Sequence, residues 1–186
     1  MVKCKWFYID LDGDEPVDAL MCEEEATAYS CNFGAACEKH KCRCSDAHMK
    51  KVTKDLYKHN FYLDIAEKYA EKSKDPKYKV GCVIVTPEGI LYPGYNGDEI
   101  GGDNVRDSME TGQSGFVHAE ANAILKFNPT IHKCSIMYLT FNPCVVCARM
   151  IVNTQAIMAV YYRKEYPADL RGVEILNKRG ILCQRI

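Results

Sequence analysis

The sequence lacks a long apolar run and an excess of positive charge. No stretch approaches the roughly 20 apolar residues that span a bilayer, and the opening residues, which include Lys3, Lys5 and Asp10, lack the apolar core of a signal peptide. We therefore expect a soluble, cytoplasmic protein without a membrane partner. Its 24 Lys and Arg are balanced by 25 Asp and Glu, with a net charge of -1 and no basic block. Long nucleic acid is therefore not expected as a partner, because binding to its backbone needs clustered positive charge.

The sequence gives no sign of a secreted disulfide protein. In a reducing compartment, its 11 cysteines are explained as metal ligands, buried apolar residues or idle thiols. Six of them precede residue 49 in a polar, weakly periodic stretch, and regular patterns follow it. We therefore predict a Cys-rich N-terminal extension at 1–49 and one further domain at 50–186. A second, structural zinc in the extension stays an open alternative, although the spacing of its candidate ligands is irregular: Cys31, Cys37, His40, Cys42, Cys44 and His48.

Hydrophobic periodicity over 50–186 predicts helices that alternate with strands after an initial hairpin. Helices are predicted over 49–73, with a candidate break near Asn60, and over 118–127, 144–154 and 168–179; strands are predicted over 80–86, 90–95, 134–141, 157–162 and 181–184. The long loop over 97–115 holds five glycines and no apolar run, and such a loop is usually functional or mobile. This order predicts an α/β fold, a three-layer α/β/α sandwich around a mixed five-stranded sheet.

Two short motifs carry the chemistry. His118-Ala119-Glu120 and Pro143-Cys144-Val145-Val146-Cys147 together match the His-x-Glu and Pro-Cys-x-x-Cys signature of zinc deaminases. Either half alone would be weak evidence, because a histidine near a glutamate is usually a surface pair and two cysteines are often core thiols. Together, at two predicted helix starts, they favour a metal site.

The spacing of these residues has a physical reason. Side chains at i and i+3 share one face of a helix, so Cys144 and Cys147 can reach one tetrahedral Zn²⁺, and the helix N-terminus favours the thiolate form. His118 is the third predicted ligand, and three protein ligands leave one position open, as in catalytic zinc sites. Glu120 is the predicted proton shuttle between water and the ring nitrogen beside the amino-bearing carbon.

The chain resembles the deoxycytidylate deaminases of the cytidine deaminase superfamily. The resemblance rests on residues 73–85, on Gly94-Tyr95-Asn96-Gly97, on His118 to Ile124 and on 143–147, and it covers about residues 50–186. It implies a cytidine deaminase-like fold and hydrolysis of dCMP to dUMP and ammonia, which supplies dUMP for thymidylate synthesis. It also implies a homohexamer that dCTP activates and dTTP inhibits, with Mg²⁺ bound to the allosteric triphosphate.

The resemblance assigns further site residues. It places Asn96 and Ala119 beside the substrate, and it implicates Tyr95, Asn96 and Gly97 in the allosteric nucleotide pocket, where Gly94 and Gly97 would let backbone amides approach. From the residues alone, turn chemistry is the favoured explanation of Asn96 before a glycine, and it is the resemblance that favours a ligand-binding role. Arg106 in the long loop is the candidate contact for the 5′-phosphate, and a solvated arginine beside Asp103 and Asp107 is the alternative.

Two other classes of protein stay open. A tRNA adenosine deaminase or a single-strand cytidine deaminase would carry the same zinc motifs, but the balanced charge argues against a polynucleotide substrate. A nucleotide sensor that kept zinc without turnover is the second alternative, and Glu120 argues against it, because a proton shuttle has no structural duty.

Overall fold

The computed structural model describes residues 5–7, 18–20, 46–166 and 170–186. The chain forms two compact units, residues 1–57 and 58–186. The first contains a small antiparallel sheet of β1 (Lys5–Phe7) and β2 (Asp18–Leu20), in which Lys5 pairs with Leu20. The predicted second zinc site lies outside the described residues, apart from His48, whose side chain is also not described. The predicted boundary at residue 49 falls within α1 (Asp46–Ala70).

The second unit has the predicted three-layer α/β/α architecture. Its sheet has the order β4-β3-β5-β6-β7, and the β4-β3-β5 part is antiparallel while β5-β6-β7 is parallel. The strands are β3 (Gly81–Val85), β4 (Leu91–Tyr95), β5 (Ser135–Phe141), β6 (Ile157–Lys164) and β7 (Leu182–Arg185). The helices on the sheet after α1 are α2 (Ala119–Ile124), α3 (Val145–Thr154) and α4 (Arg171–Lys178). The prediction of a mixed five-stranded sheet covered on both faces is confirmed.

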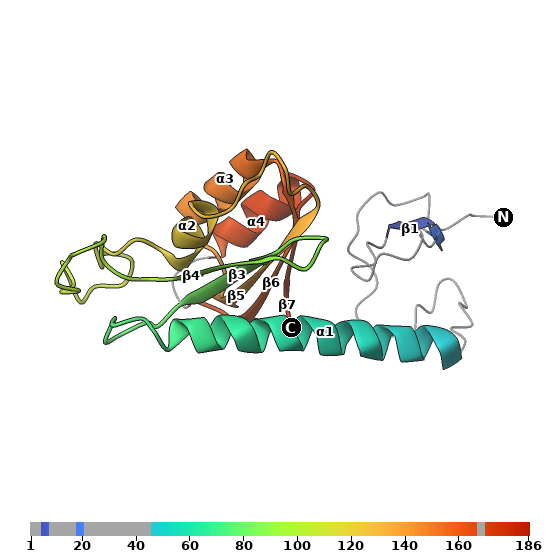
Figure 1. Ribbon diagram of the computed structural model, residues 1–186, viewed down its shortest axis with the longest axis horizontal. Coiled ribbons are helices and arrows are strands. Elements are labelled where there is room, and N and C mark those ends of the chain that lie inside the picture. The colour runs from blue at the N-terminus through green and yellow to red at the C-terminus, as the bar shows by residue number, and fades with distance from the viewer. Residues whose placement is uncertain (1–4, 8–17, 21–45, 167–169) are drawn as a thin grey trace. The chain divides into compact units, whose positions relative to one another are not determined.

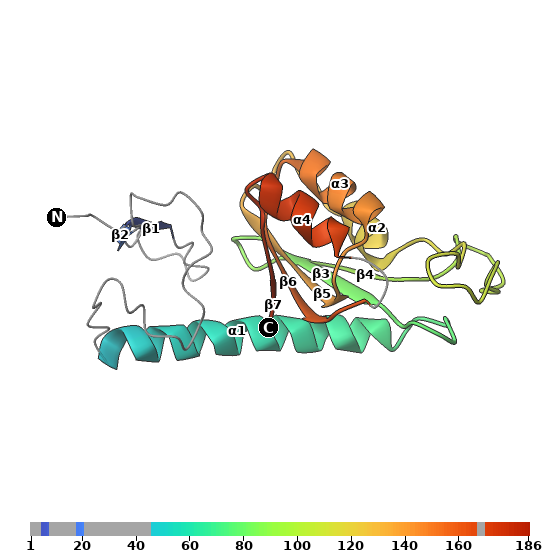
Figure 2. The same cartoon turned by 180° about the vertical axis from the view of Figure 1, so that it is seen from behind.

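The two faces of the sheet bury separate cores. On one face, α1 contributes Leu63 and Ala66, which pack with Val83, Val85 and Tyr138. The helices α2, α3 and α4 cover the other face (Figure 1). Figure 2 shows the same layers from behind. No described helix is both long and apolar enough to cross a membrane.

Several predicted helix and strand ends were wrong. The helix α1 is continuous through Asn60, because the packing of Leu63 and Ala66 outweighs the weak helix propensity of one asparagine. It ends at Ala70, three residues before the predicted end at residue 73. The amides of Lys72 and Ser73 bond three residues back, in a tighter turn. The helix α2 ends at Ile124 for the same reason, since the amides of Lys126 and Phe127 also bond three residues back. The strand β6 continues to Lys164, and the predicted start of the last helix at Ala168 lies outside the described residues.

The strand β4 forms one edge of the sheet and contains Pro93. Two side chains, one in α2 and one just after it, donate hydrogen bonds to the outward-facing carbonyls of β4. Asn122 Nδ2 donates to Tyr95 O at 2.9 Å, and Lys126 Nζ donates to Pro93 O at 2.8 Å. A Cβ atom on Gly94 would lie 2.1 Å from the Ala119 carbonyl oxygen, so only glycine allows α2 to lie this close to β4. The edge strand and the first turn of α2 are therefore tightly joined.

Candidate metal centre and active site

His118 and Glu120 stand at the start of α2. His118 is the N-cap residue, with an extended backbone (φ -71°, ψ 153°), and Glu120 lies buried in the first turn. The preceding residue is fixed to the sheet edge, since Gly97 N donates to Val117 O at 3.2 Å and Val117 N donates to Gly97 O at 2.8 Å. The backbone that carries the histidine is thus anchored at the end of β4.

Cys144 and Cys147 stand at the start of α3. Cys144 is the N-cap residue (φ -72°, ψ 170°), and its Sγ accepts a hydrogen bond from Cys147 N at 3.5 Å. The helix α4 packs directly behind Pro143, where a Cβ atom on Gly172 would lie 2.0 Å from the Pro143 carbonyl oxygen. The cap and this close packing hold both thiols on the same side as His118.

The three predicted ligands come together as one donor set. His118 Nδ1 lies 3.5 Å from Cys144 Sγ and 3.3 Å from Cys147 Sγ, and the three ligand atoms lie within 4.8 Å of one another. Tetrahedral zinc with Zn–S of about 2.3 Å and Zn–N of about 2.0 Å needs ligand separations of roughly 3.5–3.8 Å. The donor types and the distances therefore fit a zinc ion bound through Nδ1 of the histidine.

The electrostatics of the donor set concentrate negative charge on one sulfur. The pKa of Cys144 is lowered to about 4 by hydrogen bonds from the Cys147 side chain, His118 and the Cys147 amide. The bond with Cys144 raises the pKa of His118 to about 9. The pKa of Cys147 is raised by its hydrogen bond with Cys144 and by burial. The expectation that the helix terminus favours thiolate agrees with the lowered pKa of Cys144, which accepts a hydrogen bond from the Cys147 amide at the start of α3.

Glu120 lies beside the donor set. Burial raises the pKa of its carboxyl, and the nearby His118 counteracts this. Its side chain also shares a hydrogen bond with Cys147. A buried carboxyl with a raised pKa, next to a metal-ligand set, is suited to taking up and returning a proton.

Asn96 is buried and its amide is committed to the protein. Its Nδ2 donates to Asp75 Oδ2 at 3.1 Å and to Tyr78 O at 2.8 Å, and its Oδ1 accepts from Val80 N at 2.8 Å. Its backbone is not in the left-handed region, so the turn explanation was wrong. Both amide hydrogens are used, while the oxygen keeps one lone pair. A ligand of Asn96 must therefore offer a donor.

Arg106 is buried in the protein. Its side chain is 5 % exposed, and Nη1 donates to both oxygens of Asp75 at 2.6 and 2.7 Å. The alternative of a solvated arginine beside Asp103 and Asp107 was therefore wrong. The predicted phosphate contact stays a prediction, since a guanidinium has five donors. Sequence reasoning missed Asp75, because a carboxylate directly before Pro76 gives no sign of a partner 31 residues away.

The remaining predicted residues lie around the start of α2. Ala119 is fully buried in the core. A side chain on Gly94 would collide with α2, so helix packing explains this glycine and its predicted role at a nucleotide has no support. The Gly97 amide is bonded to Val117, and Tyr95 is 37 % exposed. A surface pocket of about 450 Å³ lies beside them, lined by Asp98, Glu99, Ile100, Val117, Asn122 and Leu125.

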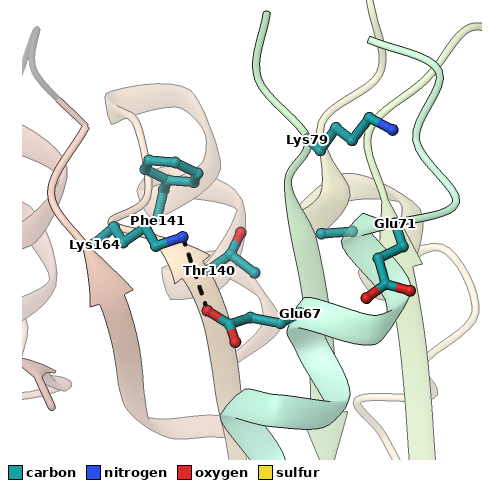
Figure 3. Close-up of a pocket in the computed structure, with 7 residues that line it drawn as sticks. Glu67, Glu71, Lys79, Thr140, Phe141 and Lys164 are labelled. Atoms are coloured by element: carbon teal, nitrogen blue, oxygen red, sulfur yellow. Dashed lines mark ion pairs between the residues drawn. The ribbon is translucent and has the colours of Figure 1, made fainter. Parts of the chain in front are cut away.

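A second pocket, of about 250 Å³, contains none of the predicted residues (Figure 3). It lies between the end of α1 and the ends of β5 and β6, and charged side chains of both signs line it. Lys164 points toward Glu67, with Nζ 3.9 Å from Oε1. This ion pair offsets one positive and one negative charge of the pocket.

Comparisons with known proteins agree with this geometry. The family model for the cytidine and deoxycytidylate deaminase zinc-binding region matches residues 56–164. A probable deoxycytidylate deaminase of Caenorhabditis elegans is 40% identical over 116 residues, which span 58% of each chain. The human deoxycytidylate deaminase is 31% identical over 131 residues, which cover 66% of this chain and 74% of the relative. The crystal structure of a dCMP deaminase from cyanophage S-TIM5, in complex with dCMP and dUMP, has a TM-score of 0.60 at 28% identity and covers 68% of this chain and 95% of that one.

Proposed function

Because the chain belongs to the family of cytidine and deoxycytidylate deaminases, we propose that it hydrolyses dCMP to dUMP and ammonia. The observation that carries this proposal is the donor set of His118, Cys144 and Cys147 beside the buried Glu120. The choice of dCMP is supported by the names of the worm and human relatives and by the phage enzyme with bound dCMP and dUMP.

The residues divide the chemistry between them. Zinc bound by His118, Cys144 and Cys147 supplies the Lewis acidity that makes water nucleophilic near neutral pH. Glu120 takes a proton from the attacking water and delivers it to N3 of cytosine, so that the water oxygen adds at C4. It then transfers the second water proton to the amino group, which leaves as ammonia. Burial of Glu120 raises its pKa and so helps it to hold each proton between these steps.

Asn96 contributes to substrate recognition in this proposal. Its amide hydrogens are bonded to Asp75 and Tyr78, so the free lone pair on Oδ1 is what it offers to a ligand. A sugar hydroxyl is a donor of the right kind, whereas a phosphate is not. Ala119 begins α2 directly after His118, and we propose that its backbone contacts the cytosine base.

Ammonia release tests the function directly. We expect the zinc-loaded protein to deaminate dCMP far faster than deoxycytidine or a cytosine-containing oligonucleotide. Preferred turnover of the oligonucleotide would instead identify a polynucleotide deaminase. No turnover of any of the three at full zinc content would contradict the proposed activity and favour the nucleotide sensor. The Glu120→Gln variant is the matched control for zinc-independent ammonia release.

We also propose regulation by pyrimidine triphosphates at Tyr95, Asn96 and Gly97, with dCTP as activator and dTTP as inhibitor. The pocket beside them is lined in part by Val117, the residue before the ligand His118, so an occupant there could bias the active site. Asp98 and Glu99 also line it, and their charge supports a requirement for Mg²⁺ with the triphosphate.

Substrate saturation curves test the regulation. We expect the dCMP curves without effector, with dCTP and Mg²⁺, and with dTTP and Mg²⁺ to differ, with a coupling of roughly 1–3 kcal/mol. The Gly97→Val variant should lose this response. Superimposed wild-type curves would refute regulation, and a normal response of Gly97→Val would place the effector elsewhere.

A homohexamer that supplies dUMP for thymidylate synthesis completes the proposal. The resemblance to deoxycytidylate deaminases supports both the hexamer and the supply of dUMP. The hexamer is tested by the molar mass of the protein in solution. Light scattering on the zinc-loaded protein should give six times the 21.1 kDa of one chain. A smaller mass at micromolar concentration would contradict the hexamer and leave the proposed chemistry intact.

A further inference from the structure

The carboxylate of Asp75 is the centre of a buried polar network beside the active site. The residue is 2 % exposed. Its Oδ1 accepts from Lys77 N at 2.8 Å, Tyr78 N at 3.2 Å and Arg106 Nη1 at 2.7 Å, and its Oδ2 accepts from Arg106 Nη1 at 2.6 Å and Asn96 Nδ2 at 3.1 Å. Both oxygens are therefore engaged by protein groups, so that Asp75 itself has little capacity to bind substrate.

One branch of the network leads through Asn96 to the ligand histidine. Asp75 and the Tyr78 carbonyl orient the Asn96 amide. The next residue, Gly97, exchanges two backbone hydrogen bonds with Val117, at 3.2 and 2.8 Å. Val117 is directly bonded to His118, so this branch fixes the backbone on which the metal ligand stands.

The second branch leads through Arg106 to the same backbone. Besides Asp75, the guanidinium bonds Ser108 O through Nε at 2.9 Å and lies 6.0 Å from the centre of the Phe116 ring. Phe116 is buried, two residues before His118. The loop between β4 and α2 is thus held at its base by Gly97 and Val117 and near its middle by Arg106. Figures 1 and 2 both show this loop at the same end of the sheet as the segment after α1, which contains Asp75.

A buried ion pair in this place is poorly explained by stability alone. Removing two charges from water costs several kcal/mol per ion, and apolar residues of similar volume often serve as well. What the charged pair adds is a fixed position, because Nη1 of Arg106 bonds both oxygens of Asp75 while Nε bonds the Ser108 carbonyl. The first branch passes through the Asn96 amide, and both branches end on the backbone just before His118. These are the two parts of the site that need a fixed geometry.

We infer that Asp75 is a positioning residue: its carboxylate locks Asn96 and Arg106, and through them the 116–118 backbone, into the arrangement that deamination requires. This inference rests on the proposed function for its catalytic part. Its structural part, the immobilisation of residues 97–117, can be measured without substrate.

Three variants test it in the zinc-loaded full-length protein. Asp75→Asn keeps the size of the side chain and removes its charge, and Arg106→Gln removes the partner. Lys77→Ala is the matched control, because the Lys77 side chain also contacts the loop, at Met109 O and Thr111 Oγ1, but is exposed and outside the network. Zinc content, kcat and KM for dCMP, and backbone amide hydrogen exchange are measured for each.

We expect Asp75→Asn and Arg106→Gln to keep one zinc per chain, to lose at least tenfold in kcat/KM per bound zinc, and to accelerate exchange of the Gly97 and Val117 amides at least tenfold. The double variant should lose no more than the worse single variant, since both act through one contact. Lys77→Ala should stay within twofold of wild type in each readout.

Other outcomes overturn the inference. Faster exchange with unchanged kcat/KM would reduce Asp75 to a structural role, and lower kcat/KM with unchanged exchange would show that it acts otherwise. Additive losses in the double variant would show that Arg106 has a separate role, such as phosphate binding. If wild type deaminates no dCMP, the proposed function fails; the exchange data then decide whether Asp75 immobilises the loop, and unchanged exchange rejects that as well.

Discussion

Adding a single methyl group at Gly94 should separate the placement of the catalytic groups from the overall stability of the fold. The new Cβ of Gly94→Ala would lie 2.1 Å from the Ala119 carbonyl oxygen and 2.6 Å from the Ala123 amide nitrogen. An ordinary contact begins at 3.4 Å, so α2 must move by the difference, about 1.3 Å. Ala119 stands between His118 and Glu120, which therefore move with it.

The expected cost to activity exceeds the cost to stability. Overpacking of this kind costs roughly 1–3 kcal/mol, and part of it is offset because alanine restricts the unfolded chain more than glycine, by about 0.4–1 kcal/mol. We therefore expect a net loss of about 1–2 kcal/mol of unfolding free energy. A displacement of about 1 Å at a reacting group can lower turnover on the order of 10²-fold, which corresponds to about 2.7 kcal/mol.

The assay compares Tm, zinc content and dCMP turnover at a temperature well below Tm. Gly97→Ala is the matched control, assayed without effector, because its new Cβ would meet only Asn104 Oδ1, at 3.5 Å. We expect the control to match wild type in Tm and turnover. Wild-type kcat/KM in Gly94→Ala would refute the argument that the contact of β4 with α2 sets the position of Glu120. A fall in turnover that only matches the fraction unfolded would refute it as well.

Three further predictions concern the metal centre. Glu120→Gln should keep zinc and fold but lose roughly 10²- to 10⁴-fold in kcat, because proton transfer is removed; near wild-type turnover at equal zinc content would contradict the role of Glu120. Cys147→Ala and His118→Ala should each lose the zinc, because two remaining protein ligands seldom hold it tightly; stoichiometric zinc by metal analysis in either variant would contradict the ligand assignment. Zinc binding at pH 7 should release about two protons, one from His118, whose pKa is raised to about 9, and one from Cys147, whose pKa is also raised. Affinity should therefore fall as pH falls, and calorimetry in buffers of different ionisation enthalpy that showed no proton release would refute this.

The parts of the site that the sequence predicts are the local ones. Cys144 and Cys147 stand three residues apart at one helix start, so their spacing alone places them on one side. His118 and Glu120 are only two residues apart, and it is the His-x-Glu motif that predicts a shared site for them. The long-range step, that the two helix starts meet, follows from the alternation of helices and strands. The structure brings the three ligand atoms within 4.8 Å of one another.

The parts that the sequence does not predict depend on partners far along the chain. The bond of Arg106 with Asp75 joins residues 31 positions apart, and that of Asn96 with Asp75 joins residues 21 apart. Neither bond follows from hydrophobic periodicity, because the loop over 97–115 has no regular pattern from which the direction of a side chain could be predicted. The candidate break at Asn60 failed for a related reason, since the burial of Leu63 and Ala66 against the sheet decides that stretch of α1.

The proline in β4 limits how copies of this chain can associate. An additional strand pairing along this edge would find no amide hydrogen at Pro93. It would also find the outward carbonyls of Pro93 and Tyr95 already bonded by Lys126 and Asn122. β-Augmentation at this edge is thereby blocked. Any assembly that forms on the β4 side of the sheet must therefore use side chains of α2 and the neighbouring loop, where the contact would lie next to the residues that carry the metal.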